Sequence, residues 1–236
     1  MNKNKKLTRI KNFFLDIFFP KFCFGCKKEG EYLCEDCRAT LEILESQYPK
    51  CQSKKLNGLY FALLYRNPLI KELIKKFKYE PFVKELGDTL ASLILDHFLL
   101  IGKNPQKDFA GFLIVPVPLD KSRKKWRGFN QAEEIGKNLA QYLNISLEID
   151  TLIKIKKTAL QVNLNRKERQ ENVKEAFKVK NTQAVKEKKI LLVDDVYTTG
   201  STMEECAKVL KKAGAKEVWG AVIARARPGE DRFEKI

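Results

Sequence analysis

The chain has 236 residues, with 46 lysines and arginines against 30 acids, a formal net charge of +16 and a single histidine. This length accommodates one α/β domain with a small additional module, and one histidine nearly excludes a histidine-centred metal site or hydrolytic triad. The positive excess indicates a polyanionic partner, either nucleic acid or an anionic membrane surface, although a general lysine bias on solvated faces gives the same balance.

The apolar stretch near the N-terminus, IKNFFLDIFFP at residues 10–20, does not have the pattern of a secretory signal. It is short, contains Lys11, Asp16 and Pro20, and lacks a small-residue cleavage site. No run of the sequence is long enough to span a bilayer. We therefore expect a cytoplasmic protein that is not an integral membrane protein. We favour a short helix packed on the protein for this basic, amphipathic start. The alternative is peripheral contact with the inner membrane.

Four of the six cysteines form two C-x-x-C pairs, Cys23 with Cys26 and Cys34 with Cys37. This C-x2-C-x7-C-x2-C array is typical of a structural zinc site with four thiolate ligands. Two disulfides are disfavoured because nothing marks the chain for an oxidising compartment, and iron–sulfur clusters usually have other spacings. We expect an N-terminal helix and zinc module over residues 1–55, followed by the main domain over residues 56–236.

Apolar patterns in the middle of the chain predict alternating strands and helices. Residues 59–65 and 112–117 are expected strands, and the second ends in prolines that cannot continue a central ladder. Asn130 with Glu133 is the expected N-cap of a helix that continues to about residue 143. Two further helices are expected over 67–79 and about 81–100. His97 in the latter is most simply a core or surface residue.

A basic segment lies between the second strand and the Asn130 helix. Five of the seven residues from Lys121 to Arg127 are basic, and aromatic rings accompany them. Basic residues interleaved with rings suit single-stranded nucleic acid, since cations contact phosphates and rings stack on bases. The alternative is a mobile active-site loop that binds pyrophosphate. The candidate DNA-binding residues are Lys121, Arg123, Lys124, Lys125, Trp126, Arg127 and Phe129.

The last third of the chain predicts a buried strand, a loop and a helix. Residues 190–193 are uniformly apolar, as in a parallel strand covered on both faces, and the helix after the loop has Cys206 on its apolar face and Gly214 as its stop. Residues 158–179 are polar and basic and are expected to form a hood over the sheet. A last buried strand is expected at 217–225. The pattern predicts an α/β fold with a parallel sheet covered by helices.

The loop between that strand and helix has the composition of a ribose-phosphate site. The small residues 198–202 allow a phosphate to approach the backbone at a helix N-terminus, and Asp194 and Asp195 suit hydrogen bonds from sugar hydroxyls. The stretch VDDVYTTGST closely resembles the phosphoribosyl-pyrophosphate (PRPP) motif of type I phosphoribosyltransferases, with Tyr197 where an aliphatic residue is more common. The resemblance implies Asp194 and Asp195 as catalytic residues and a PRPP site of Asp194, Asp195, Val196, Tyr197, Thr198, Thr199, Gly200, Ser201 and Thr202.

Nearly the whole chain resembles the ComF family of phosphoribosyltransferase-like competence proteins. The resemblance rests on the two cysteine pairs, Lys78-Tyr79, V-P-V-P at 115–118, R-G-F-N-Q-A at 127–132, and the PRPP motif. It implies a type I phosphoribosyltransferase fold, which is a twisted, mostly parallel sheet flanked by helices. The resemblance further implies hood elements at about 56–80 and 150–180, and a flexible arm at 121–129. It also implies a pyrophosphate loop of Val117, Pro118 and Leu119. Many members have a second cysteine pair where this chain has only Cys51, so one zinc is expected.

The family resemblance implies a role in natural transformation, in which single-stranded DNA is brought across the inner membrane with the DNA-uptake machinery and its helicase-like partner. Our leading hypothesis is a DNA-uptake factor that binds single-stranded DNA and, with Mg²⁺, PRPP or a related phosphoribosyl ligand. The alternative is a metabolic phosphoribosyltransferase that transfers ribose 5-phosphate to a nitrogenous base, with electrostatic stabilisation of the transition state. A scaffold without ligand is disfavoured, because every polar element of the PRPP motif is present.

Overall fold

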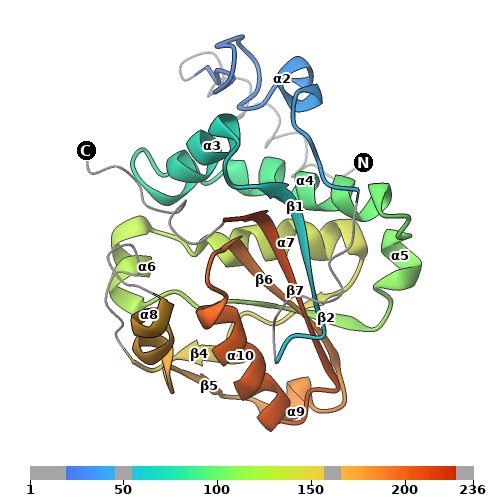
Figure 1. The fold of residues 1–236 in the computed structure, drawn as a ribbon, viewed down its shortest axis with the longest axis vertical. Helices are drawn as coiled ribbons and strands as arrows, with labels where there is room; N and C mark the ends of the chain where they lie inside the picture. Colours follow the sequence, from blue (N-terminus) through green and yellow to red (C-terminus); the bar gives the residue numbers. More distant parts are fainter. Residues whose placement is uncertain (1–19, 46–54, 157–165, 227–236) are drawn as a thin grey trace, which may run out of the picture. The chain divides into compact units, whose positions relative to one another are not determined.

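The computed structural model describes residues 20–45, 55–156 and 166–226 (Figure 1). The chain divides into two compact units, Met1–Glu42 and Ile43–Ile236. The expected N-terminal helix, Cys51 and the first part of the hood segment lie outside the described residues. None of the described helices has the length and apolar character needed to cross a membrane.

The first unit is a small cysteine module. An isolated bridge between Phe22 and Glu29 closes its first turn, and the rings of Phe24 and Tyr32 stack with centroids 5.7 Å apart. One short helix, α2 (Glu35–Ala39), follows Cys34. So small a unit can bury little apolar surface, so it usually needs disulfides or a bound metal to hold its fold.

The second unit is built on a five-stranded, entirely parallel sheet in the order β1-β7-β6-β2-β3. The central strand β6 is flanked by β7 and β2, with Val193 opposite Ala221 on one side and Pro116 on the other. The strands are β1 (Gly58–Leu64), β2 (Phe112–Pro116), β3 (Ser146–Leu147), β6 (Lys189–Tyr197) and β7 (Glu217–Arg225).

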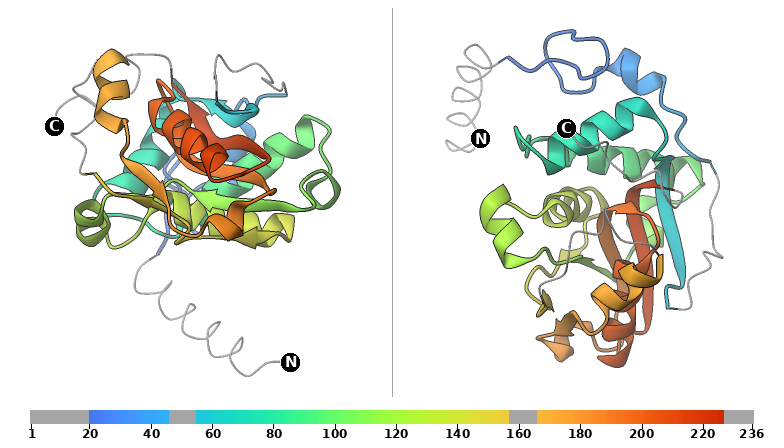
Figure 2. Two further views of the ribbon diagram at one scale, coloured as in Figure 1. Left: turned by 90° about the horizontal axis from the view of Figure 1, so that it is seen from below. Right: turned by 60° about the vertical axis from the view of Figure 1, so that its left-hand side comes forward.

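Helices cover both faces of this sheet (Figures 1 and 2). On one face α4 packs against β1 and β7, while α7 packs against β2 and β6. On the other face α10 packs against β6 and β7. The helices of the unit are α3 (Pro68–Lys78), α4 (Leu86–Leu100), α5 (Pro105–Asp108), α6 (Lys121–Arg127), α7 (Gln131–Leu143), α8 (Arg166–Val173), α9 (Thr182–Val185) and α10 (Ser201–Lys212).

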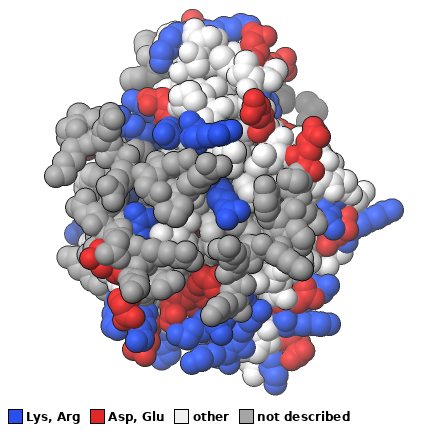
Figure 3. All heavy atoms as spheres, in the orientation of Figure 1, with Lys and Arg blue, Asp and Glu red and all other residues white. Residues whose placement is uncertain are grey.

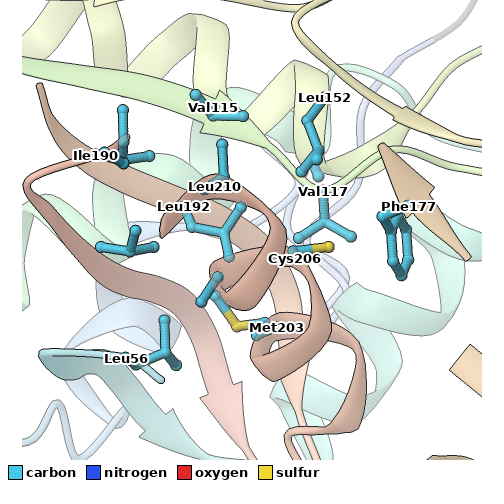
Figure 4. Packing of buried hydrophobic residues seen from close by; sticks show 14 of the residues in the cluster. Leu56, Val115, Val117, Leu152, Phe177, Ile190, Leu192, Met203, Cys206 and Leu210 are labelled. Atoms are coloured by element: carbon cyan, nitrogen blue, oxygen red, sulfur yellow. The ribbon is translucent and has the colours of Figure 1, made fainter. Parts of the chain in front are cut away.

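Alternating side chains of the strands form a core on each face. Ile190 and Leu192 of β6 belong to the core under α10, together with Cys206 and Leu210 of that helix (Figure 4). Leu191 and Val193, one residue out of step, are equally buried on the other side. A strand with apolar residues on both faces has its polar groups only at its ends, which is where the acids of β6 lie.

A second, two-stranded antiparallel sheet lies outside the main one. It consists of β4 (Leu152–Lys154) and β5 (Phe177–Val179), and α8 between them packs against α10. These elements occupy the range expected for a hood near 150–180. The other hood range, about 56–80, contains β1, which pairs with β7 in the main sheet, and α3.

Most expected elements are confirmed, but the helix expected from about residue 81 begins at Leu86. Phe82 has a φ of 55°, which a helix cannot include, and the Val83 N–H donates back to Lys76. The second difference lies at 121–129, where the resemblance implied a flexible arm. Residues 121–127 form a helix, capped by Asp120 through the Ser122 N–H and ended by Gly128 in the left-handed region.

Candidate functional site

Residues 198–202, which we call the hydroxyl loop, are four hydroxyl residues around Gly200. They lead from the end of β6 into the first turn of α10 at the carboxyl edge of the sheet. Gly200 is the N-cap of α10 with a φ of 79°, and a Cβ there would collide with the Tyr197 hydroxyl. The hydroxyls of Thr199 and Ser201 are 2.9 Å apart. The loop therefore combines a helix N-terminus, a glycine and clustered hydroxyls, which together suit a phosphate.

The hood contributes a cation to this loop. Arg169 of α8 is buried, and its Nη1 donates to the Thr198 hydroxyl over 3.1 Å. No periodicity or spacing in the sequence marks Arg169 as a neighbour of the loop. It adds positive charge where a phosphate would bind.

The two acids lie within the last residues of β6, because this strand extends to Tyr197. Adjacent side chains of a strand point to opposite faces, so the two carboxylates separate. Asp195 is paired with Lys78 at the end of α3, with Nζ 2.9 Å from Oδ1. Asp194 lies on the other side, where its charge interacts with the buried Cys206 thiol and with Lys154 of β4. The acids therefore have different environments.

Asp194 holds its proton unusually well. Burial, followed by the negative charge of Asp195, raises the pKa of Asp194 to about 7, although Lys78 and Lys154 oppose the shift. A carboxyl group with a pKa near neutrality can donate or accept a proton at physiological pH.

The residues expected to form the pyrophosphate loop follow β2 directly. The Val117 N–H donates to the Val193 carbonyl over 2.9 Å, which extends the pairing with β6 by one step. The Val117 carbonyl in turn accepts from Asn130 Nδ2 over 3.0 Å, and Asn130 Oδ1 caps α7. Pro118 and Leu119, which come next, are half-buried. The loop is thus fixed at its start by the asparagine of R-G-F-N-Q.

The basic helix α6 presents part of its charge to solvent. Lys121 and Lys125 are exposed, and Trp126 is 57% exposed, with its ring perpendicular to that of Phe82. Lys124 is engaged with Glu133 at 2.7 Å, and Arg123 is half-buried. Basic side chains also gather at the end of the unit where α9 lies (Figure 3), so positive charge alone does not single out α6.

Two residues of the basic segment are directed into the protein. Phe129 is buried, with its ring centroid 5.5 Å from that of Phe77. Arg127 lies over the ring of Tyr79, donates from Nη1 to Gln131 Oε1 over 2.6 Å, and interacts electrostatically with Asp195. Phe129 has no exposed ring face on which a base could stack, so we do not retain it as a candidate DNA contact.

The cysteine module brings its four thiols together. The sulfur atoms of Cys23, Cys26, Cys34 and Cys37 all lie within 4.8 Å of one another, and none of the cysteines in the described residues forms a disulfide. Zn–S bonds of about 2.3 Å in a tetrahedron place the sulfurs ~3.8 Å apart. Desolvation alone would raise the pKa of Cys23, but backbone N–H groups outweigh it and lower this pKa to about 6, while the hydrogen bond with Cys23 and burial raise the pKa of Cys37 to about 12. The cluster fits a metal that prefers thiolates.

Comparison with known proteins agrees with the fold. A family model described as the phosphoribosyl transferase domain matches residues 117–235. Competence protein F of Haemophilus influenzae is 32% identical, with 86% of this chain and 90% of the relative covered. Competence protein ComFC of Streptococcus pneumoniae is 29% identical, covering 81% and 87%. DNA utilization protein YhgH of Escherichia coli is 36% identical, covering 84% and 86%.

Replacing Asp194 by asparagine is expected to flatten the pH dependence of stability. The folded chain keeps a proton on Asp194 that the unfolded chain releases near its ordinary pKa of 3.8. The associated stability is present at low pH and is lost as pH rises through about 7. As pH rises from 5 to 8, the free energy of unfolding of D194N should therefore increase by roughly 2 kcal/mol relative to that of wild type, because only wild type loses this contribution.

The measurement is the free energy of unfolding from urea titrations at several pH values. D150N, which removes an exposed acid, is the control and should follow the wild-type profile. Equal pH slopes for D194N and wild type would contradict the assignment.

Proposed function

The chain belongs to the ComF family of phosphoribosyltransferase-domain proteins, and we propose that it is a DNA-uptake factor that binds single-stranded DNA and a Mg²⁺-bound phosphoribosyl diphosphate. The relatives named competence protein and DNA utilization protein support the biological role. The observation that carries the biochemical part is the position of α6. Its outer face exposes Lys125 and Trp126, while the next residue, Arg127, interacts with Asp195.

In this proposal the hydroxyl loop binds the 5-phosphate of the ligand and the acids accept hydrogen bonds from its ribose hydroxyls. The diphosphate lies against Val117, Pro118 and Leu119, where Mg²⁺ neutralises part of its charge. Arg169, which donates to Thr198, adds a cation at the phosphate end. The two acids have the residue type and the location at the carboxyl edge of the sheet that a ribose site requires.

Single-stranded DNA is proposed to follow the outer face of α6. Lys121 and Lys125 contact phosphates, and the exposed Trp126 ring stacks on a base. Lys124 and Arg127 contribute less to this surface because they are engaged with Glu133 and Gln131. We also propose a helicase-like partner at the inner membrane, because passage of a strand through a membrane requires a motor.

Neutralising both acids is expected to abolish binding of Mg²⁺-PRPP. The D194N/D195N variant keeps the shape of both side chains but loses the carboxylates that accept from ribose hydroxyls. Isothermal titration calorimetry should give measurable binding for wild type and none for the variant. D150N serves again as the control, and an unchanged affinity of the double variant would contradict the assignment of the acids.

Changes on α6 are expected to separate phosphate contacts from base stacking. K121A/K125A should lower the magnitude of the salt slope of single-strand binding by about 1.4, because the variant makes two fewer phosphate contacts and binding therefore releases fewer counterions. W126A should weaken binding by about 1–3 kcal/mol with the slope unchanged. Fluorescence anisotropy of a labelled single strand at several salt concentrations measures both quantities.

The matched control for this experiment is K186A/K188A, which removes the same charge from two exposed lysines between α9 and β6. Its affinity should stay close to wild type at physiological salt, where exposed charges are screened over about 8 Å. If the control loses as much as K121A/K125A, the charge acts without a defined surface and α6 is not the DNA site.

The metal of the cysteine module is proposed to be structural zinc, bound by Cys23, Cys26, Cys34 and Cys37. Elemental analysis of purified protein should give one zinc per chain, and C26S/C37S should lose it because half of the ligands are removed. C206A, which changes the buried thiol of α10, should retain the zinc. A full zinc content in C26S/C37S would rule out these ligands.

A further inference from the structure

Lys78 is the last residue of α3 and differs from the other lysines of that helix. Its side chain is 19% exposed and its Nζ lies 2.9 Å from Asp195 Oδ1, whose side chain is 10% exposed. Burial alone would lower the pKa of Lys78, but the charge of Asp195 outweighs it and the pKa is raised. Lys76, two residues earlier, instead pairs with Glu72 on the same helix at 3.5 Å. Lys78 is therefore committed to the strand end.

The end of α3 that presents Lys78 is fixed by several contacts. Gln131 Nε2 donates to the Phe77 carbonyl over 3.1 Å. The Tyr79 N–H donates to Lys75 and the Val83 N–H to Lys76. Arg127 covers the Tyr79 ring. Because these contacts already fix the backbone at Lys78, only its side chain has to be ordered when it binds Asp195. The ion pair can therefore define the position of the Asp195 carboxylate.

A buried ion pair of this kind adds little to stability by itself, because removing two charges from water offsets most of their attraction. Its effect is orientation. The bond from Lys78 to Oδ1 restrains the Asp195 carboxylate, and Oδ2, which accepts no hydrogen bond from the described residues, can accept one from a ligand hydroxyl. Asp194, on the other face of β6, has no cation at a comparable distance among the ion pairs of the described residues.

We propose that Lys78 is a positioning residue of the phosphoribosyl site, which orients Asp195 for a ribose hydroxyl without contacting the ligand's reacting atoms. This inference rests on the proposed function, since it names a residue that the same site requires. It also assigns the two acids different roles. Asp195 is the acceptor that an ion pair orients, and Asp194, on the other face of β6, is not held by an ion pair among the described residues.

The test compares the affinity of Mg²⁺-PRPP for wild type, K78M, K78R and K76M by calorimetry at one pH. K78M removes the ammonium and should weaken binding at least tenfold. K78R restores a cation that can bind the Asp195 carboxylate and should return the affinity to within threefold of wild type. K76M, a matched loss of one lysine charge from the same helix, should bind like wild type. A thermal melt of each unliganded variant checks that it is folded.

The outcomes separate this inference from the proposed function. K78M binding within twofold of wild type, or K78R binding as weakly as K78M, overturns the positioning role and leaves the proposed function intact. No binding by wild type overturns both. If K78M does not fold, K78A replaces it with the same thresholds, since alanine also removes the ammonium group and leaves no donor.

Discussion

The end of β6 imposes the constraint on which the rest of the site depends. Two adjacent acids lie there at the end of a strand that is apolar on both faces, and Asp195 is buried while Asp194 is half-buried. One of them, Asp195, is compensated by Lys78 from α3, and the other, Asp194, retains a pKa near 7. Both acids can lie within a folded sheet because Lys78 offsets the charge of Asp195 and Asp194 can keep its proton.

The R-G-F-N-Q segment connects this strand end to its surroundings. Asn130 holds the start of the loop after β2, and Gln131 holds the end of α3. Arg127 lies over the Tyr79 ring and interacts electrostatically with Asp195. One short segment therefore sets three neighbours of the proposed ligand site. Because Trp126 directly precedes Arg127, the proposed DNA surface and the phosphoribosyl site share a single helix end, which gives a physical basis for two ligands on one protein.

The sequence predicted much of the fold because its signals were local. The apolar run at 190–193, the Asn130 cap and the C-x-x-C pairs all depend on residues close in the chain, and the structure confirms β6, α7 and the thiol cluster. Contacts between distant segments were not predictable in the same way. Lys78 and Asp195 are far apart in sequence, and a lysine at the end of a basic helix looks like a solvated one until the strand end is placed beside it. Phe129 illustrates the same limit, since its ring packs against Phe77 of α3, a contact between segments that are distant in the chain.

The most direct test of the account is fluorescence anisotropy of a labelled single strand with the wild-type chain, with and without Mg²⁺-PRPP, at two salt concentrations. The account predicts binding that weakens as salt rises and that changes when Mg²⁺-PRPP is added, because Trp126 and Arg127 link the two sites. Absence of DNA binding at low salt, together with consumption of PRPP in the presence of a nitrogenous base, would contradict it and identify a metabolic phosphoribosyltransferase instead.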